Sequence, residues 1–173
     1  HEAAAGNTVV TRFYQQAATS MDNIPENSVA ILPIQGPITK YGDACSYGTQ
    51  DYENTLRMLG ANSNVSGVIL QIDSPGGMVS GTEMFAKSVR AFTDTYKKPI
   101  VALADGMMAS AAYWIGSQAN EIWLLGETSS VGSIGTMTTI LDFRQSFEND
   151  GIKLQEVYAS ASSNKNDVYR QAI

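Results

Sequence analysis

Ser110 stands in a segment whose residue types suit a nucleophilic serine, the run D-G-M-M-A-S-A-A-Y-W-I-G at 105–116. The preceding run at 100–104, I-V-A-L-A, is wholly apolar, which is typical of a strand covered on both faces of a parallel sheet. We expect that strand to stop at the D-G pair and an alanine-rich helix to occupy 109–119. Ser110 then lies where a strand turns into a helix, and unpaired amides at a helix start favour an oxyanion beside a serine hydroxyl. From this segment alone, a helix-capping serine explains the pattern equally well.

The base that such a serine needs has few candidates, because the only histidine is His1. A Ser-His-Asp triad, a Cys-His pair and a histidine metal site all need an imidazole on the folded scaffold. The single cysteine, Cys45, excludes an internal disulfide and a thiolate metal cage. Lysine is the remaining base, if burial lowers its pKa from about 10.4. Lys165, in a run of serine and asparagine, is one candidate, although a solvated surface charge is the commoner role for a lysine.

A second glycine-rich turn, D-S-P-G-G at 73–77, comes after another apolar strand that we expect at 67–72. Gly76 and Gly77 can offer backbone amides where a side chain would obstruct, although glycines there equally suit a tight turn. Ligands bind beyond the carboxyl ends of the strands in parallel sheets. We therefore expect this turn and the turn at Ser110 to face each other.

Strands and helices alternate along the chain, which predicts an α/β fold with a mostly parallel sheet flanked by helices. Further strands are expected at 28–34, 121–125 and 152–158, with a possible short one at 8–14. Further helices are expected at 51–59 with Gly60 as its stop, from about 81 to 96 with an S-x-x-E capping box of Ser80 and Glu83, and at 141–150 with Gly151 as its C-terminal cap. Residues 1–27 are interpreted as an N-terminal arm or tail, and residues 28–173 as a single domain.

Composition excludes several classes of function. The chain has 173 residues, of which 43% are hydrophobic, so it is long and apolar enough for one domain with a core. Seventeen acidic and eleven basic residues give a net charge of −6 without a basic cluster, which argues against a nucleic-acid partner. No apolar run approaches the roughly 20 residues that span a bilayer. Because the sequence begins with His1 and shows no basic then apolar targeting segment, we expect a fragment or a processed form.

Three motifs, in this order and spacing, carry a family resemblance: D-S-P-G-G at 73–77, M-A-S-A-A-Y-W at 108–114 and V-G-S-I-G at 131–135. Over about residues 28–168 the chain resembles the signal peptide peptidase A (protease IV) family of serine peptidases, which includes head-maturation peptidases of tailed phages. That family shares its fold with the Clp protease and crotonase superfamily. The resemblance implies a Clp protease/crotonase-like fold of repeated β-β-α units, and a serine endopeptidase that needs no metal or cofactor.

The resemblance also implies a role for individual residues. Ser110 is the implied nucleophile of a Ser-Lys dyad and Lys165 is its base, with Lys153 as a second choice because Asn164 stands where the family usually has glycine. Ser133 is implied to orient the base. The implied oxyanion donors are the amides of Gly77, Ala111 and, as a further candidate, Gly76. The implied substrate strand consists of Val131, Gly132, Ser133, Ile134 and Gly135, whose backbone can pair with an extended peptide.

The implied partners are a peptide or protein substrate, either signal-peptide remnants or phage capsid and scaffold proteins, and further copies of the chain. Relatives form rings in which a neighbouring subunit can supply the lysine, and they continue with further helices, so a C-terminal truncation is expected. The bacterial cytoplasm or a phage prohead is the favoured location, with an envelope-anchored full-length form as the alternative. Two alternatives remain open: a crotonase-type acyl-CoA enzyme, whose paired amides would hold a thioester enolate, and a non-catalytic capsid-assembly subunit.

Overall fold

The computed structural model describes residues 9–12, 24–42, 46–137, 139–153, 155–162 and 164. The chain divides into two compact units, His1–Gly135 and Thr136–Ile173. The first unit contains the sheet and the candidate site, and the second contains one short helix. The boundary between the two units falls inside residues 28–173, which the sequence analysis interpreted as a single domain. The bounds of that domain stay a prediction.

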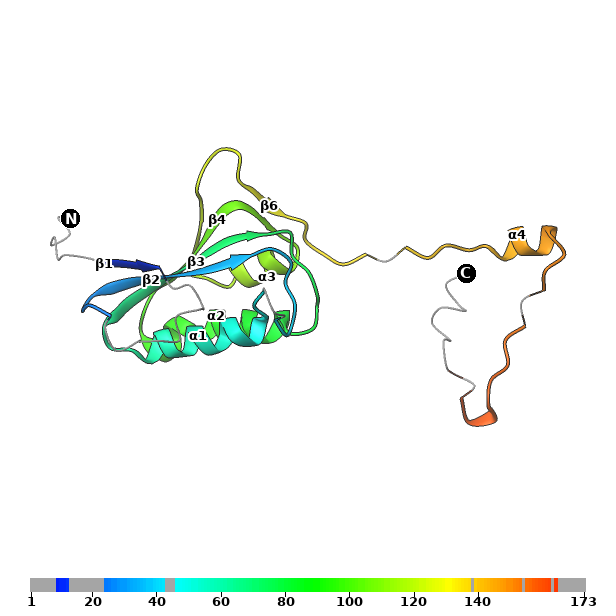
Figure 1. Ribbon diagram of the computed structural model, residues 1–173, viewed down its shortest axis with the longest axis horizontal. Coiled ribbons are helices and arrows are strands. Elements are labelled where there is room, and N and C mark those ends of the chain that lie inside the picture. Colours follow the sequence, from blue (N-terminus) through cyan, green and yellow to red (C-terminus); the bar gives the residue numbers. More distant parts are fainter. Residues whose placement is uncertain are drawn as a thin grey trace. The chain divides into compact units, whose positions relative to one another are not determined.

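Unit 1 is an α/β body built on a six-stranded sheet (Figure 1). Five strands lie side by side in chain order: β1 (Val9–Arg12), β2 (Ser28–Gln35), β3 (Val65–Ser74), β4 (Ile100–Ala109) and β5 (Glu121–Leu124). A sixth, β6 (Ser130–Gly132), pairs with the last residues of β4, and every pair of strands is parallel. The predicted α/β class with a mostly parallel sheet is confirmed. The edge strand β1 comes from the predicted N-terminal arm.

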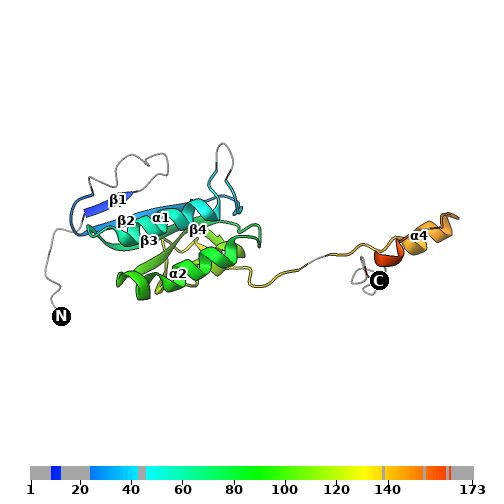
Figure 2. The ribbon, with the colours of Figure 1, turned by 90° about the horizontal axis from the view of Figure 1, so that it is seen from below.

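Two long helices, α1 (Thr49–Ala61) and α2 (Thr82–Tyr96), lie on one face of the sheet, as Figures 1 and 2 show from two directions. The short helix α3 (Ala111–Gly116) comes after β4. Alternate side chains of the central strands point into the core that the helices cover. The fully buried large side chains include Leu32, Ile34, Leu70, Ile72, Leu56, Leu59, Phe85 and Phe92. This core holds the carboxyl ends of β3 and β4 in fixed positions.

Two predicted helix signals are wrong. The proposed capping box does not form, because α2 begins after Gly81 with φ +90° and makes no side-chain capping bond. Glu83 instead pairs with Lys87 at 2.6 Å, and the hydrogen bond from Lys87 lowers the pKa of Glu83. Gly60 does not stop α1, which continues to Ala61. The ring of Tyr96 lies against Gly60 where a side chain would stand, so this glycine serves close helix packing.

Unit 2 contains α4 (Arg144–Asn149), which is shorter than the predicted helix, and the 3-10 turn η2 (Ser160–Ser162). Gly151 lies just after α4 with φ +74° and its amide donates to the carbonyl of Glu148 at 3.0 Å. The predicted strand at 152–158 is not formed by its described residues. An alternating pattern gives a strand only where a neighbouring strand accepts its backbone bonds.

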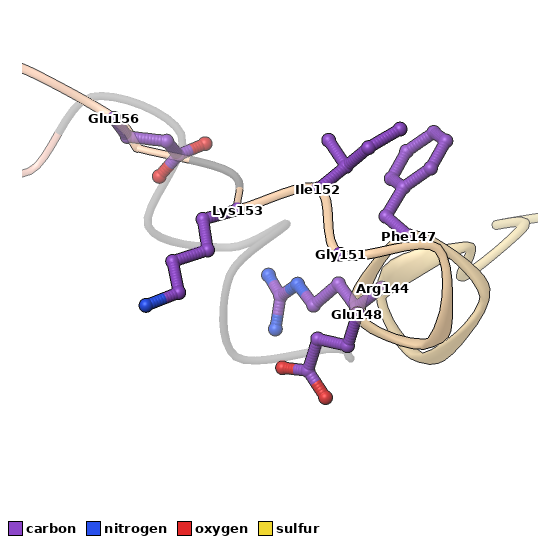
Figure 3. A pocket seen from close by; sticks show the side chains of 7 residues that line it. All are labelled: Arg144, Phe147, Glu148, Gly151, Ile152, Lys153 and Glu156. Atoms are coloured by element: carbon purple, nitrogen blue, oxygen red, sulfur yellow. The ribbon is translucent and has the colours of Figure 1, made fainter.

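A pocket of about 670 Å³ lies in unit 2 (Figure 3). It is lined by Arg144, Phe147, Glu148, Gly151, Ile152, Lys153 and Glu156. Of the residues predicted for the site, this lining includes only Lys153, which is exposed. In the described part of the chain, no helix has both the length and the hydropathy needed to cross a membrane.

Candidate active site

Ser110 lies between the last residue of β4 and the first residue of α3, as predicted. Its backbone has φ +53° and ψ −121°, a combination that is strained for any residue other than glycine. The amide of Ser110 donates to the carbonyl of Gly132 at 2.8 Å, and its carbonyl accepts from the amide of Trp114 at 2.9 Å. The side chain makes no capping hydrogen bond. This geometry matches a sharp nucleophile turn and counts against a simple capping role.

β4 does not stop at the D-G pair, because a bulge carries it on to Ala109. Residues 105–107 of β4 lie opposite the single residue Asp73 of β3. The amide of Met107 donates to Asp73 Oδ1 at 3.1 Å, and Gly106 takes φ +103° beside the same carboxylate. A bulge bends a strand and changes the direction of the residues beyond it. The predicted end of the strand at Asp105-Gly106 is wrong, because the carboxylate that accepts the Met107 amide belongs to Asp73 on the neighbouring strand β3.

The turn after β3 packs directly against Ser110. Gly76 has φ +95°, and a Cβ added to it would lie 2.7 Å from the carbonyl oxygen of Ala109, 2.7 Å from Ser110 Cβ and 2.9 Å from the amide nitrogen of Ala111. Only a residue without a side chain fits between these atoms. The expectation that the two glycine-rich turns face each other is confirmed.

The amides of the two glycines differ in their hydrogen bonding. The Gly76 amide donates to Ser74 Oγ at 3.1 Å, so it is already engaged. Gly77 forms a parallel bridge with Ile38, in which Ile38 donates to the Gly76 carbonyl and accepts from the Met78 amide, both at 2.8 Å. In such a bridge the Gly77 amide points away from Ile38, and no described residue accepts a hydrogen bond from it. Gly77 is also exposed, so its amide is open to a bound molecule.

A further amide is provided by Ala111, the first residue of α3. The first amides of a helix have no carbonyl partner within the helix. Its nitrogen lies close to Gly76, as the 2.9 Å separation from the added Cβ shows. The contact between Gly76 and the Ser110 turn thus brings the segments that carry the Gly77 and Ala111 amides together.

The segment V-G-S-I-G begins in β6 and passes Ser110. β6 pairs with Met107, Met108 and Ala109 of β4, and the next residue of that strand end, Ser110, bonds to Gly132. Ser133 comes next, with φ +55°, and is exposed, as are Val131, Ile134 and Gly135. Among the described strands, β6 pairs only with β4, so its other edge is open to an extended chain.

The predicted base, Lys165, lies outside the described residues. Lys153 belongs to unit 2, whereas Ser110 belongs to unit 1. Lys98, whose pKa burial lowers, donates to the carbonyls of Gly60 at 2.7 Å and Asn62 at 2.6 Å. It precedes β4 whereas Ser110 comes after it, so the strand, which spans roughly 30 Å at about 3.3 Å per residue, separates them. Lys98 therefore caps α1 and is out of reach of the serine in its own chain.

Sequence reasoning missed Asp73, Ser74 and Ile38. Each acts through a residue distant in the chain: Asp73 through the β4 bulge, Ser74 through the Gly36 carbonyl and Ile38 through the Gly77 bridge. The available signal was that Asp73 and Ser74 are the first two residues of the D-S-P-G-G motif. Within the described ranges, no three His, Cys, Asp or Glu residues gather as metal ligands would.

Comparison with known proteins shows that this chain is similar to peptidases. Residues 93–172 match the model of Peptidase family S49. Capsid assembly protease C of Escherichia phage lambda is 29% identical over 140 residues, covering 78% of this chain and 31% of that protein. Protease 4 of Haemophilus influenzae is 28% identical over 147 residues, covering 82% of this chain and 23% of that protein. The chain thus spans about a quarter to a third of the length of these relatives.

Among solved structures, a mutant of the 1510-N membrane-bound stomatin-specific protease is 20% identical, with a TM-score of 0.46 over 57% of this chain and 44% of that one. ClpP1 from Listeria monocytogenes is 22% identical, with a TM-score of 0.42 over 51% of this chain and 46% of that one. The family match includes both Ser110 and the V-G-S-I-G segment. The predicted resemblance to signal peptide peptidase A and its phage relatives is therefore confirmed: residues 93–172 match the Peptidase family S49 model, and the similar proteins include a protease 4, a phage capsid assembly protease and a putative signal peptide peptidase SppA of Enterococcus faecium.

Proposed function

We propose that this chain is the catalytic part of a serine endopeptidase that cleaves peptides through an acyl-enzyme, with a Ser-Lys dyad. The observation that carries the proposal is the turn at Ser110. Its backbone is strained, its hydroxyl makes no capping bond, and Gly76, whose neighbour Gly77 has an amide without a partner among the described residues, packs against Ser110 and the Ala111 nitrogen. A serine that merely ends a strand has no need of this arrangement.

In the proposed reaction, a neutral lysine accepts the proton of Ser110 Oγ as that oxygen attacks the substrate carbonyl carbon. The carbonyl oxygen becomes an oxyanion, which the amides of Gly77 and Ala111 stabilise. The tetrahedral intermediate collapses, the C–N bond breaks, and the lysine returns the proton to the leaving amine. Water then hydrolyses the acyl-enzyme, with the lysine again as base. Lys165 is the proposed base, and Ser133, next to Gly132, is proposed to orient it.

The proposed substrate binds as an extended strand along the open edge of β6, so that Val131 to Gly135 pair with its backbone. Two relatives are named a capsid assembly protease and a putative signal peptide peptidase. We accordingly propose phage capsid or scaffold proteins, or remnants of signal peptides, as the substrates of this chain. We also propose a homo-oligomeric ring, in which Lys165 acts on the serine of its own subunit or of a neighbour.

Cleavage of a fluorogenic peptide library by the full chain tests this function. We expect cleavage that a fluorophosphonate inhibits and that EDTA leaves unchanged, because the proposed dyad uses only side chains and amides. Loss of cleavage on chelation would contradict the dyad. Absence of any cleavage, together with calorimetric binding of an acyl-CoA, would favour the crotonase-type alternative.

Replacing Lys165 with alanine tests the base. We expect kcat near neutral pH to fall by about 10²- to 10⁴-fold, because general-base catalysis contributes that much. The remaining activity should need higher pH, since hydroxide must then take the serine proton. Lys87→Ala is the control, because Lys87 pairs with Glu83 on the exposed side of α2. An unaltered pH profile in Lys165→Ala would refute this role, and a loss confined to Lys153→Ala would move it to Lys153.

A further inference from the structure

We infer that Ser74 is a positioning residue for the proposed peptidase: its hydroxyl fixes the orientation of the Gly77 amide. The inference rests on the proposed function, since it concerns the amide assigned to the oxyanion. Ser74 is the last residue of β3 and is completely buried. It stands inside the motif D-S-P-G-G without touching the reacting atoms.

The Ser74 hydroxyl joins two segments of the chain. It donates to the carbonyl of Gly36, just after β2, at 2.7 Å. It accepts from the amide of Gly76 at 3.1 Å. The hydroxyl thus acts as both a donor and an acceptor. Among the described residues, it is the acceptor for the Gly76 amide. A buried hydroxyl with this double role holds the turn against the end of β2.

The orientation of Gly77 depends on these bonds because of how a peptide group is built. The Gly76 carbonyl and the Gly77 amide belong to one planar trans peptide, so they point in opposite directions. The carbonyl accepts from Ile38 at 2.8 Å, which turns the Gly77 amide to the other side. Ser74 secures the preceding amide, so the peptide groups on both sides of Gly76 are held by one hydrogen bond each.

Two successive glycines could not hold this orientation alone. Glycine populates positive and negative φ about equally, so the turn has no steric preference for the observed φ of +95° at Gly76. Hydrogen bonds must select it, and Ser74 supplies one of them from a buried position. Without the hydroxyl, we expect the Gly76–Gly77 peptide to populate orientations in which the oxyanion loses a donor.

The test compares Ser74→Ala with Ser28→Ala in the full chain. Ser28 is also completely buried and donates to the Pro25 carbonyl at 2.7 Å, but it lies at the opposite end of the sheet, where β2 begins. We expect Ser74→Ala to lower kcat about 10- to 100-fold with KM changed less than about threefold, because only the transition state carries the oxyanion. Ser28→Ala should keep kcat, although its thermal midpoint falls. Ser74→Thr, which retains the hydroxyl, should recover most of the lost kcat.

Equal kcat in Ser74→Ala and Ser28→Ala would overturn the inference, as would a folded Ser74→Thr that is as slow as Ser74→Ala. If Ser74→Ala does not fold, Ser74→Cys carries the same test, since a thiol is a weak hydrogen-bonding group. An unchanged kcat in folded Ser74→Cys would then overturn the inference. Wild-type chain and Ser110→Ala are measured in parallel. Cleavage that survives in Ser110→Ala would refute the proposed function itself, whereas Ser110-dependent cleavage that is insensitive to Ser74 would refute only the positioning role.

Discussion

Replacing Ser110 with alanine is expected to abolish peptide cleavage while leaving the fold intact. The nucleophilic oxygen is lost, and loss of the nucleophile in related mechanisms lowers kcat by roughly 10⁶-fold. The free energy of unfolding should change by less than about 1 kcal/mol, because the hydroxyl makes no capping bond and alanine keeps the Cβ. Steady-state kinetics and thermal denaturation of the same preparation measure the two effects.

Ser110→Gly is the matched control for backbone strain. At φ +53° and ψ −121° a side chain is unfavourable, and glycine removes that strain of about 1–3 kcal/mol. This variant should be inactive yet unfold at a higher temperature than Ser110→Ala. Such a result would show that the position is kept as serine at the expense of stability. Cleavage by either variant at the wild-type rate would contradict the assignment of Ser110.

Replacing Gly76 with alanine is expected to slow cleavage strongly and also to destabilise the fold. The new Cβ would stand 2.7 Å from Ser110 Cβ and 2.9 Å from the Ala111 nitrogen, closer than real Cβ contacts allow. The two turns must move apart, which displaces the nucleophile from the oxyanion amides. A misplacement of about 1 Å can lower a rate about 10²-fold, and we expect at least that loss of kcat. The free energy of unfolding should fall by about 1–3 kcal/mol.

Gly151→Ala is the control that separates the steric clash of a new Cβ at Gly76 from the cost of placing alanine at a positive φ. Gly151 also has positive φ, +74°, but a Cβ there would meet nothing within 4 Å. It should keep the wild-type kcat and lose only the conformational part of the stability, about 1 kcal/mol. If Gly76→Ala behaved like Gly151→Ala in kcat, the close contact between the two turns would not matter for the reaction.

The parts of the fold that depend on local patterns were predictable from the sequence. β2 and β3 were predicted within a few residues, because continuous apolar runs have few other uses in a parallel sheet. The end of β4 was not, since Asp73 on the neighbouring strand supplies the acceptor for its bulge. The strand predicted at 152–158 failed for a related reason, because its pattern carries no information about a partner strand.

In the candidate site, the positions of the two turns were predictable from the sequence, whereas their hydrogen bonds were not. Ser110 and the facing glycine turn result from a topological rule, that the carboxyl ends of parallel strands share one edge. The difference between the amides of Gly76 and Gly77 was not predictable, because it depends on the Ser74 hydroxyl and on the bridge from Ile38. The Ser74 hydroxyl is held by Gly36, 38 residues earlier, and the Gly77 bridge likewise reaches back to Ile38, so neither is visible in the local sequence pattern. Lys165 stays a prediction.

Mapping the residue that a fluorophosphonate modifies tests the central claim most directly. The native full chain is treated with the reagent, digested and analysed by peptide mass spectrometry, with heat-unfolded chain as the control. We expect one adduct, on Ser110, that forms only in the folded protein, because the reaction needs both the activated hydroxyl and the oxyanion amides. An adduct on a different residue, or equal labelling of folded and unfolded chain, would contradict the claim that Ser110 is the nucleophile.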